Sequence, residues 1–105
     1  MTEARLTPFS NLLVVEASPG LEAALEELVT AFALHCRSQE DCLRFDCFQS
    51  CDAPGRFLLQ AVWRDSESLA LHLDSEPLRE FFVKGAKLWR GSSVEEDYRG
   101  FTPME

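Results

Sequence analysis

The apolar and polar positions at the start of this chain predict a strand followed by an amphipathic helix. Residues 9–17 have the pattern of a strand, and the run 12–15 is apolar on both pleat faces, which indicates burial on both sides. The residues Ser18-Pro19-Gly20 then turn the chain. Within them Ser18 can cap a helix and Pro19 fits its first position, so we expect a helix that ends near Arg37. The apolar face of this helix consists of Leu21, Leu25, Leu28 and Phe32.

The central part of the chain has the pattern of a hairpin. Residues 43–49 alternate in polarity and predict a second strand. Turn-forming residues within 50–55 then lead to a third strand at 57–63, which is apolar almost throughout. One face of the second strand is expected to carry Leu43, Phe45 and Cys47.

The segment 56–82 gives the clearest local prediction, because a buried strand there runs directly into an acid-capped helix. Asp65 is placed to cap a short helix through Leu73, and Ser75 with Pro77 starts a second helical piece. The apolar residues of that second piece recur at helical spacing and are Leu78, Phe81 and Phe82.

A weaker strand pattern at 91–101 completes the order βαββαβ. Right-handed crossovers turn this order into an α+β fold with a four-stranded antiparallel sheet and both helices on one face. Because the first and third strands are apolar on both faces, the uncovered face would expose a large apolar surface. We therefore expect two such sheets to pack face to face in a homodimer, with an apolar pocket between sheet and helices.

Length and charge narrow the class of protein. A chain of 105 residues is too short for two independent cores, so residues 1–105 are expected to form one domain. The net charge of −8 would repel a nucleic-acid backbone or an anionic membrane surface, so neither is an expected partner. Apolar runs are far shorter than a bilayer span and no leader pattern is present, which predicts a cytoplasmic protein.

The cysteines do not have the spacing of a metal site. They are separated by six, five and four residues, without a C-x-x-C pair, and the prediction is reduced thiols without a bound metal. Thiol chemistry at the hairpin is an alternative, but Asp46 and Asp52 would raise the thiol pKa and oppose it. The four residues are Cys36, Cys42, Cys47 and Cys51.

Three segments resemble the antibiotic biosynthesis monooxygenase (ABM) domain family. They are CLRFDCFQS at 42–50, PGRFLLQAVWRD at 54–65 and LALHLDSEPLREF at 69–81, and their order and spacing agree together over most of the chain. The resemblance implies a ferredoxin-like fold that assembles as a dimeric α+β barrel. That assembly agrees with the uncovered apolar sheet face inferred from the strands.

The resemblance also implies a range of activities. The family includes oxygenases that act on aromatic substrates without metal or flavin, quinol oxidases, haem-degrading enzymes and isomerases. The expectation for this chain is a cofactor-independent monooxygenase or quinol-type oxidase, acting on a small aromatic molecule such as a phenol or hydroquinone. Such chemistry needs a base, a polar group for the developing oxyanion and an apolar pocket that excludes water.

The resemblance points to His72 as the candidate base, because it matches the His-Leu pair of the family on the short helix. Asn11 on the first strand and Arg44 on the second could donate hydrogen bonds to a bound oxygen atom. Structural roles compete with these interpretations. His72 could be a packing histidine, and Asn11 and Arg44 could be exposed polar groups of the sheet. Aromatic residues could wall the pocket or simply pack in the core, and these are Trp63, Phe81 and Phe82.

This sequence also departs from the family pattern. Ala61 stands where a glutamate is usual, Pro77 where a second histidine is common, and Phe81 or Phe82 where a haem-degrading member would carry its iron ligand. His35 matches no family site position and is interpreted as a helix-end residue. The alternative to an enzyme is therefore a small-molecule-binding or structural homodimer that has kept the fold and lost the chemistry.

Overall fold

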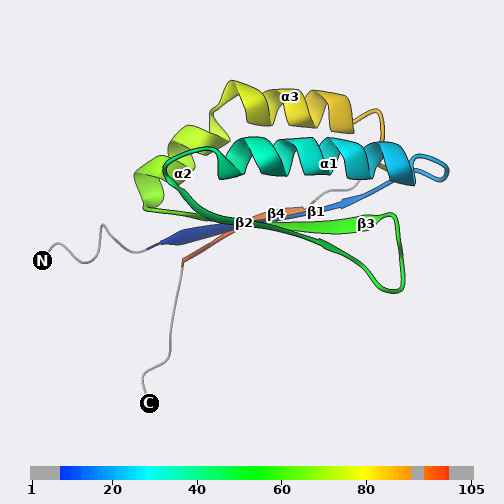
Figure 1. The fold of residues 1–105 in the computed structure, drawn as a ribbon, viewed down its shortest axis with the longest axis horizontal. Coiled ribbons are helices and arrows are strands. Elements are labelled where there is room, and N and C mark those ends of the chain that lie inside the picture. Colours follow the sequence, from blue (N-terminus) through cyan, green and yellow to red (C-terminus); the bar gives the residue numbers. More distant parts are fainter. Residues whose placement is uncertain (1–7, 91–93, 100–105) are drawn as a thin grey trace, which may run out of the picture.

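The computed structural model describes residues 8–90 and the backbone of residues 94–99. It confirms the order βαββαβ with a second helix broken in two (Figure 1). Of the weaker strand expected at 91–101, the described part is β4, and the remainder lies outside the described residues. The elements are β1 (Phe9–Glu16), α1 (Glu22–Arg37), β2 (Cys42–Gln49), β3 (Arg56–Trp63), α2 (Ser66–Leu73), α3 (Glu76–Gly85) and β4 (Val94–Arg99).

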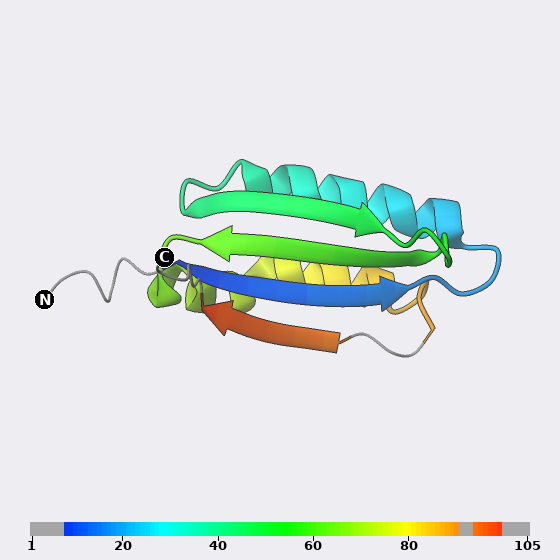
Figure 2. The same cartoon turned by 90° about the horizontal axis from the view of Figure 1, so that it is seen from below.

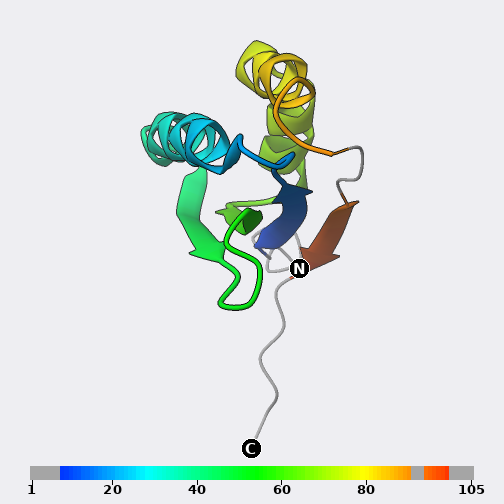
Figure 3. The same cartoon turned by 90° about the vertical axis from the view of Figure 1, so that its right-hand side faces the viewer.

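The strands form one antiparallel sheet in the order β2-β3-β1-β4 (Figure 2). In the central pair, β1 and β3 are in register from Phe9 opposite Trp63 to Glu16 opposite Arg56. The helices α1, α2 and α3 all lie on one side of this sheet, and α1 and α3 run alongside each other in opposite directions (Figures 1 and 3). The fold predicted from the sequence is therefore confirmed.

The core lies between the sheet and the helices. Alternate residues of β1 and β3 point toward the helices and are buried, among them Val15 and Leu59. Aromatic rings fill the middle of this layer, where Phe32 of α1 stacks on Phe81 of α3 with ring centroids 4.3 Å apart. The rings of Phe32 and Phe45 from β2 meet edge to face, with centroids 5.8 Å apart. On the side that faces the helices, the first and third strands are thus buried as predicted, beneath packed aromatic rings.

The other face of the sheet also carries apolar side chains. Residues that alternate with the buried ones on β1 and β3 are half-buried, and no described helix covers them (Figure 3). Strand register places them in adjacent pairs, with Val14 opposite Leu58, which in turn lies opposite Phe48 of β2. The apolar members of this outer face are Leu12, Val14, Phe48, Leu58 and Val62.

The start of α1 differs from the prediction. The helix begins at Glu22 with Leu21 as the N-cap residue, so neither Ser18 nor Pro19 caps or opens it. Instead the Leu21 amide donates to the Ser18 carbonyl at 2.9 Å, and Gly20 adopts a φ of 88° within this turn. A residue in that left-handed conformation cannot continue a right-handed helix, which moves the start of α1 beyond the glycine.

Strand β2 keeps the predicted position, and two of the three residues expected on one face, Phe45 and Cys47, share it. The register shifts between Cys42 and Arg44, so Leu43 is bulged out of the ladder and is exposed. Phe45 and Cys47 lie opposite inward-facing residues of β3, yet only Phe45 is buried. The physical reason is that β2 is an edge strand and is covered by α1 alone.

The predicted caps of α2 and α3 are confirmed. Asp65 Oδ1 accepts from the Ser68 amide at 2.9 Å, and Ser75 Oγ accepts from the Leu78 amide at 3.4 Å, with Pro77 in the first turn of α3. At the other end of α3, a Cβ atom added to Gly85 would lie 2.0 Å from the ring of Trp89. The chain can follow α3 closely at this point only because residue 85 has no side chain.

Candidate functional site

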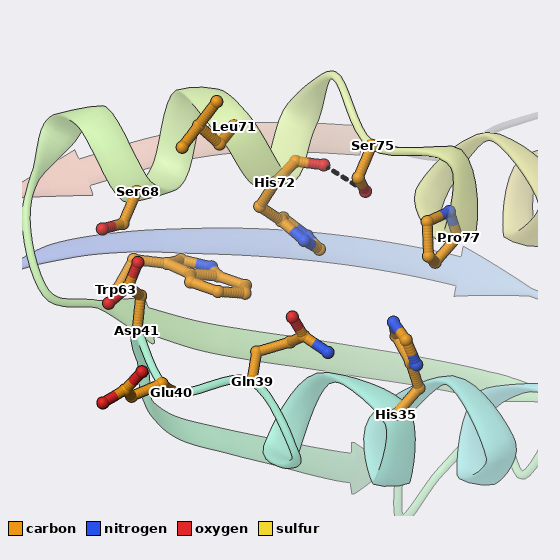
Figure 4. Close-up of a pocket in the computed structure, with 10 residues that line it drawn as sticks. All are labelled: His35, Gln39, Glu40, Asp41, Trp63, Ser68, Leu71, His72, Ser75 and Pro77. Atoms are coloured by element: carbon orange, nitrogen blue, oxygen red, sulfur yellow. Dashed lines mark hydrogen bonds between the residues drawn. The ribbon is translucent and has the colours of Figure 1, made fainter.

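A cleft of about 480 Å³ opens between the C-terminal end of α1 and the helices α2 and α3 (Figure 4). This volume is within the range of roughly 300–1,000 Å³ that small-molecule sites occupy. Its walls are both polar and apolar. The lining residues are His35, Gln39, Glu40, Asp41, Trp63, Ser68, Leu71, His72, Ser75 and Pro77.

His72 lies in the last turn of α2, and its imidazole stacks on the indole of Trp63 with ring centroids 4.4 Å apart. The ring of Phe32 is 6.0 Å away, and only 9% of His72 is exposed. The break between α2 and α3 fixes its backbone, because the Ser75 hydroxyl and amide both donate to the His72 carbonyl, at 2.7 and 3.0 Å (Figure 4). The structure therefore brings together two of the predicted site residues, His72 and Trp63.

The surroundings of His72 keep its imidazole uncharged. Burial lowers the pKa of His72 to about 4, and the electrostatic effect of the nearby His35 acts in the same direction. At neutral pH the ring therefore has a free lone pair and can accept a proton or a hydrogen bond.

The low pKa of His72 predicts a pH-dependent stability. Between the ordinary value of 6.5 and about 4, the unfolded chain binds a proton at His72 that the folded chain does not bind. The stabilisation from the neutral ring is complete above pH 6.5, and acidification through this window should lower the free energy of unfolding by up to about 3 kcal/mol. Urea unfolding at about pH 7 and about pH 4.5 measures the change.

His72→Gln is the matched variant for that measurement, because the carboxylates that also titrate in this range are the same in both proteins. The variant should lose less stability on acidification than the parent chain does. An equal loss in the two proteins would show that His72 is not the group responsible.

Trp63 contributes a second unusual feature to the cleft. Its indole Nε1–H is buried and has no hydrogen-bond partner among the described residues. An unsatisfied buried donor costs about 1–3 kcal/mol, so such groups are uncommon in folded proteins. A ligand oxygen atom that reached this N–H would remove that cost.

The space between the sheet and the helices, where the sequence led us to expect the pocket, is nearly filled. A remaining cavity of about 10 Å³ there touches Asn11 and His72, and it holds at most roughly one water molecule. Asn11 is buried on the helix side of β1 rather than exposed on the sheet. The open space lies instead at the end of this layer, beside Trp63.

The other predicted site residues do not reach the cleft. Phe81 is 2% exposed and belongs to the core, and Phe82 packs against Phe81 and Trp89 with ring centroids 5.8 and 5.7 Å away. Arg44 lies on the outer face of β2, where its side chain is exposed and forms an ion pair with Asp46.

Sequence reasoning missed the wall that α1 contributes. His35 lies in the last turn of α1 and Gln39 lies two residues beyond its end, and Figure 4 shows both side chains directed into the cleft opposite His72 and Pro77. The sequence did contain a signal for His35. It follows Leu28 by seven residues and Phe32 by three, which places all three on the same helix face. Its interpretation as a helix-end residue is incomplete, since the ring also lines the cleft.

The rim of the cleft is acidic, and no cysteine is among the described residues that line it. Glu40 and Asp41 line it, and Asp41 forms an ion pair with Arg64. Within the described residues no group of three metal-ligating side chains is suitably placed for a metal ion. Burial raises the pKa of the Cys36 thiol to about 12 and is the main cause that raises the pKa of Cys47, so both thiols resist ionisation.

Comparison with known proteins agrees with the resemblance in the sequence. Residues 8–84 match the family model described as antibiotic biosynthesis monooxygenase. No curated protein sequence matches the chain significantly.

In the described residues, no helix has the length and apolar character needed to cross a membrane.

Solved structures from several bacteria share the fold. A protein from Pseudomonas aeruginosa is 23% identical with a TM-score of 0.82, covering 93% of this chain and 98% of its own. A "putative antibiotic biosynthesis monooxygenase" from Deinococcus radiodurans is 18% identical with a TM-score of 0.84, covering 92% and 96%. A "possible oxidoreductase" from Bacteroides thetaiotaomicron is 16% identical with a TM-score of 0.81, covering 90% and 99%. Since the family model spans most of the chain, this protein belongs to the antibiotic biosynthesis monooxygenase family.

Proposed function

We propose that this protein oxidises a small phenol or hydroquinone with O₂ in the cleft beside α2, without a cofactor, and that His72 is the base. The observation that carries this proposal is the buried, uncharged imidazole of His72, stacked on Trp63 at the wall of the cleft. An aromatic ligand can stack on the same apolar surface, and the imidazole lone pair can accept its hydroxyl proton.

The overall reaction depends on the substrate. A hydroquinone loses two electrons and two protons to become a quinone, and O₂ takes them up to form H₂O₂. An anthrone-type CH₂ group instead becomes C=O, with one oxygen atom entering the substrate and the other leaving as water. In both reactions electrons pass from the electron-rich aromatic substrate to O₂.

Proton transfer to His72 is coupled to the loss of an electron in this proposal. A phenol has a pKa near 10 and His72 about 4, so simple proton transfer is uphill by roughly 8 kcal/mol. The ion pair that would form in a partly dehydrated cleft offsets part of this cost. An oxidised phenol is far more acidic than its neutral form, so the proton moves completely to His72 only as the electron leaves.

Oxygen consumption with a panel of hydroquinones and anthrones tests the proposal. Turnover should yield H₂O₂ from hydroquinones and water from anthrones, without added metal or flavin. If no member of the panel is oxidised faster than in buffer, the proposed reaction is wrong.

The outer face of the sheet supports a homodimer, which we propose as the assembly of this protein. Leu58 lies near its centre, between Val14 and Phe48 on the neighbouring strands, and Phe48 is 49% exposed. A second copy would bring an identical apolar face, and two such faces can remove each other from water.

A charge at the centre of this face should separate the dimer. We expect Leu58→Asp to convert a dimer into a folded monomer, because packing would otherwise bury an unpaired carboxylate. Sedimentation velocity measures the assembly state. Leu34→Asp is the matched control, since Leu34 is exposed on α1 away from the sheet, and it should leave the dimer intact. A parent chain that sediments as a monomer would overturn the proposed assembly.

A second candidate function is ligand binding without chemistry. Pro77 contributes no ionisable group to the cleft that it lines, and the buried Ala61 contributes none to the layer beneath. His72 would then serve as a hydrogen-bond acceptor for the ligand. Binding of phenols without oxygen consumption would favour this candidate.

A further inference from the structure

A second hollow, which the sequence did not indicate, adjoins the cleft beside His72. This groove has a volume of about 290 Å³ and lies between α1 and α3. His35 and Pro77 line both spaces, so they stand where the cleft and the groove adjoin. A ligand in the cleft can therefore extend into the groove without leaving the protein surface.

The residues that line this groove have the same spacing on both helices. Its lining residues on α1 recur at three, four and seven residues after Leu28, and those on α3 recur in the same way after Pro77. Because α1 and α3 run in opposite directions (Figure 1), His35 lies at the Pro77 end and Leu28 at the Lys84 end. Seven residues of helix make the groove roughly 10 Å long.

The surface of the groove is mainly apolar along this length. The stacked rings of Phe32 and Phe81 contribute to it, together with Leu28 and Ala31. Charged side chains come only from α3, at Glu80 and Lys84. Such a surface suits a hydrocarbon chain, which needs no hydrogen-bond partner.

We propose that the ligand of the cleft is an aromatic ring with an unbranched alkyl substituent of several carbon atoms, and that the groove between α1 and α3 binds this substituent. The inference rests on the proposed function for the nature of the ring. In it, the ring lies against Trp63 and His72, and the chain leaves between His35 and Pro77. The groove thus determines specificity for chain length and takes no part in the reaction.

Binding of 4-alkylresorcinols tests this inference separately from turnover. These compounds carry two ring hydroxyl groups but cannot be oxidised to a quinone, so calorimetry measures affinity alone. Full burial of a methylene strengthens binding about fourfold, and in this open groove we expect about twofold for each carbon from methyl to butyl. The dissociation constant should therefore fall roughly tenfold across the series.

Ala31→Trp is the variant that fills the groove. Ala31 is exposed on α1, so a larger side chain can be added without disturbing the core, and the chain-length effect should disappear while resorcinol itself still binds. Leu34→Trp is the control on the exposed part of the same helix outside the groove, and it should keep the full effect.

Two results would overturn the inference while leaving the proposed function intact. One is a flat affinity series in the parent chain that nevertheless oxidises hydroquinones, and the other is an unchanged series in Ala31→Trp. Failure of every resorcinol to bind would overturn the inference together with the phenolic class of ligand.

Discussion

Oxidation of the best hydroquinone or anthrone substrate should slow at least about 100-fold when His72 is replaced by alanine. A positioned general base contributes typically 10²- to 10⁴-fold, and the described cleft offers no other imidazole stacked on Trp63. The loss should appear in kcat, because the imidazole acts on the proton that moves in the transition state. Oxygen-electrode rates at saturating substrate measure it.

Leu71→Ala is the matched control for His72→Ala. Leu71 lines the same cleft from the same helix and is exposed, so its truncation should change kcat only slightly. Circular dichroism and urea unfolding must show that both variants are folded. Equal kcat values for His72→Ala and the parent chain would remove His72 from the chemistry, whatever the substrate.

Replacing Phe81 with alanine should lower the free energy of unfolding by about 3–5 kcal/mol. Phe81 is 2% exposed, stacks on Phe32, and meets the rings of Phe82 and Trp89 at 5.8 and 5.6 Å. Its removal would leave a cavity that these rigid rings cannot close. Urea or guanidinium unfolding at neutral pH measures the loss.

Val83→Ala provides the comparison two residues further along α3. Val83 is 61% exposed, so its truncation should change the unfolding free energy by no more than about 0.5 kcal/mol. A loss below about 1 kcal/mol in Phe81→Ala would contradict a core role. It would favour the other interpretation of Phe81, as a loosely packed wall of the pocket that was expected between the sheet and the helices.

The sequence predicted those parts of the fold that short-range patterns determine. Asp65 and Ser75 cap α2 and α3 as expected, because a side-chain cap depends only on residues within one turn. The predicted start of α1 was wrong by three residues, since Ser18 and Pro19 have the residue types of a helix start but Gly20 takes a left-handed conformation. The Pro19-Gly20 pair is a turn signal, but it does not show how many residues of the turn precede the helix.

The site was harder to predict than the fold. His72 and Trp63 meet because a short loop joins β3 to α2, so few residues separate them along the chain. His35 and Gln39 join them only through the packing of α1 beside α2 and α3, and sequence spacing carries no measure of that packing. The residue type of Phe81 likewise fits a pocket wall and a core equally well, so only its stacking on Phe32 separates the two.

The bulge at Leu43 has a consequence for the way copies of this protein can associate. An open sheet can grow without limit when further strands add to its edge, which is the route to filaments. On β2 the bulge interrupts the hydrogen-bonding edge, and the charged pair Arg44 and Asp46 follows it directly. Association along this edge is therefore opposed, whereas the stacking of outer faces that we propose would bury the exposed apolar surface and end with two copies. The irregular edge thus favours a closed assembly over an endless one.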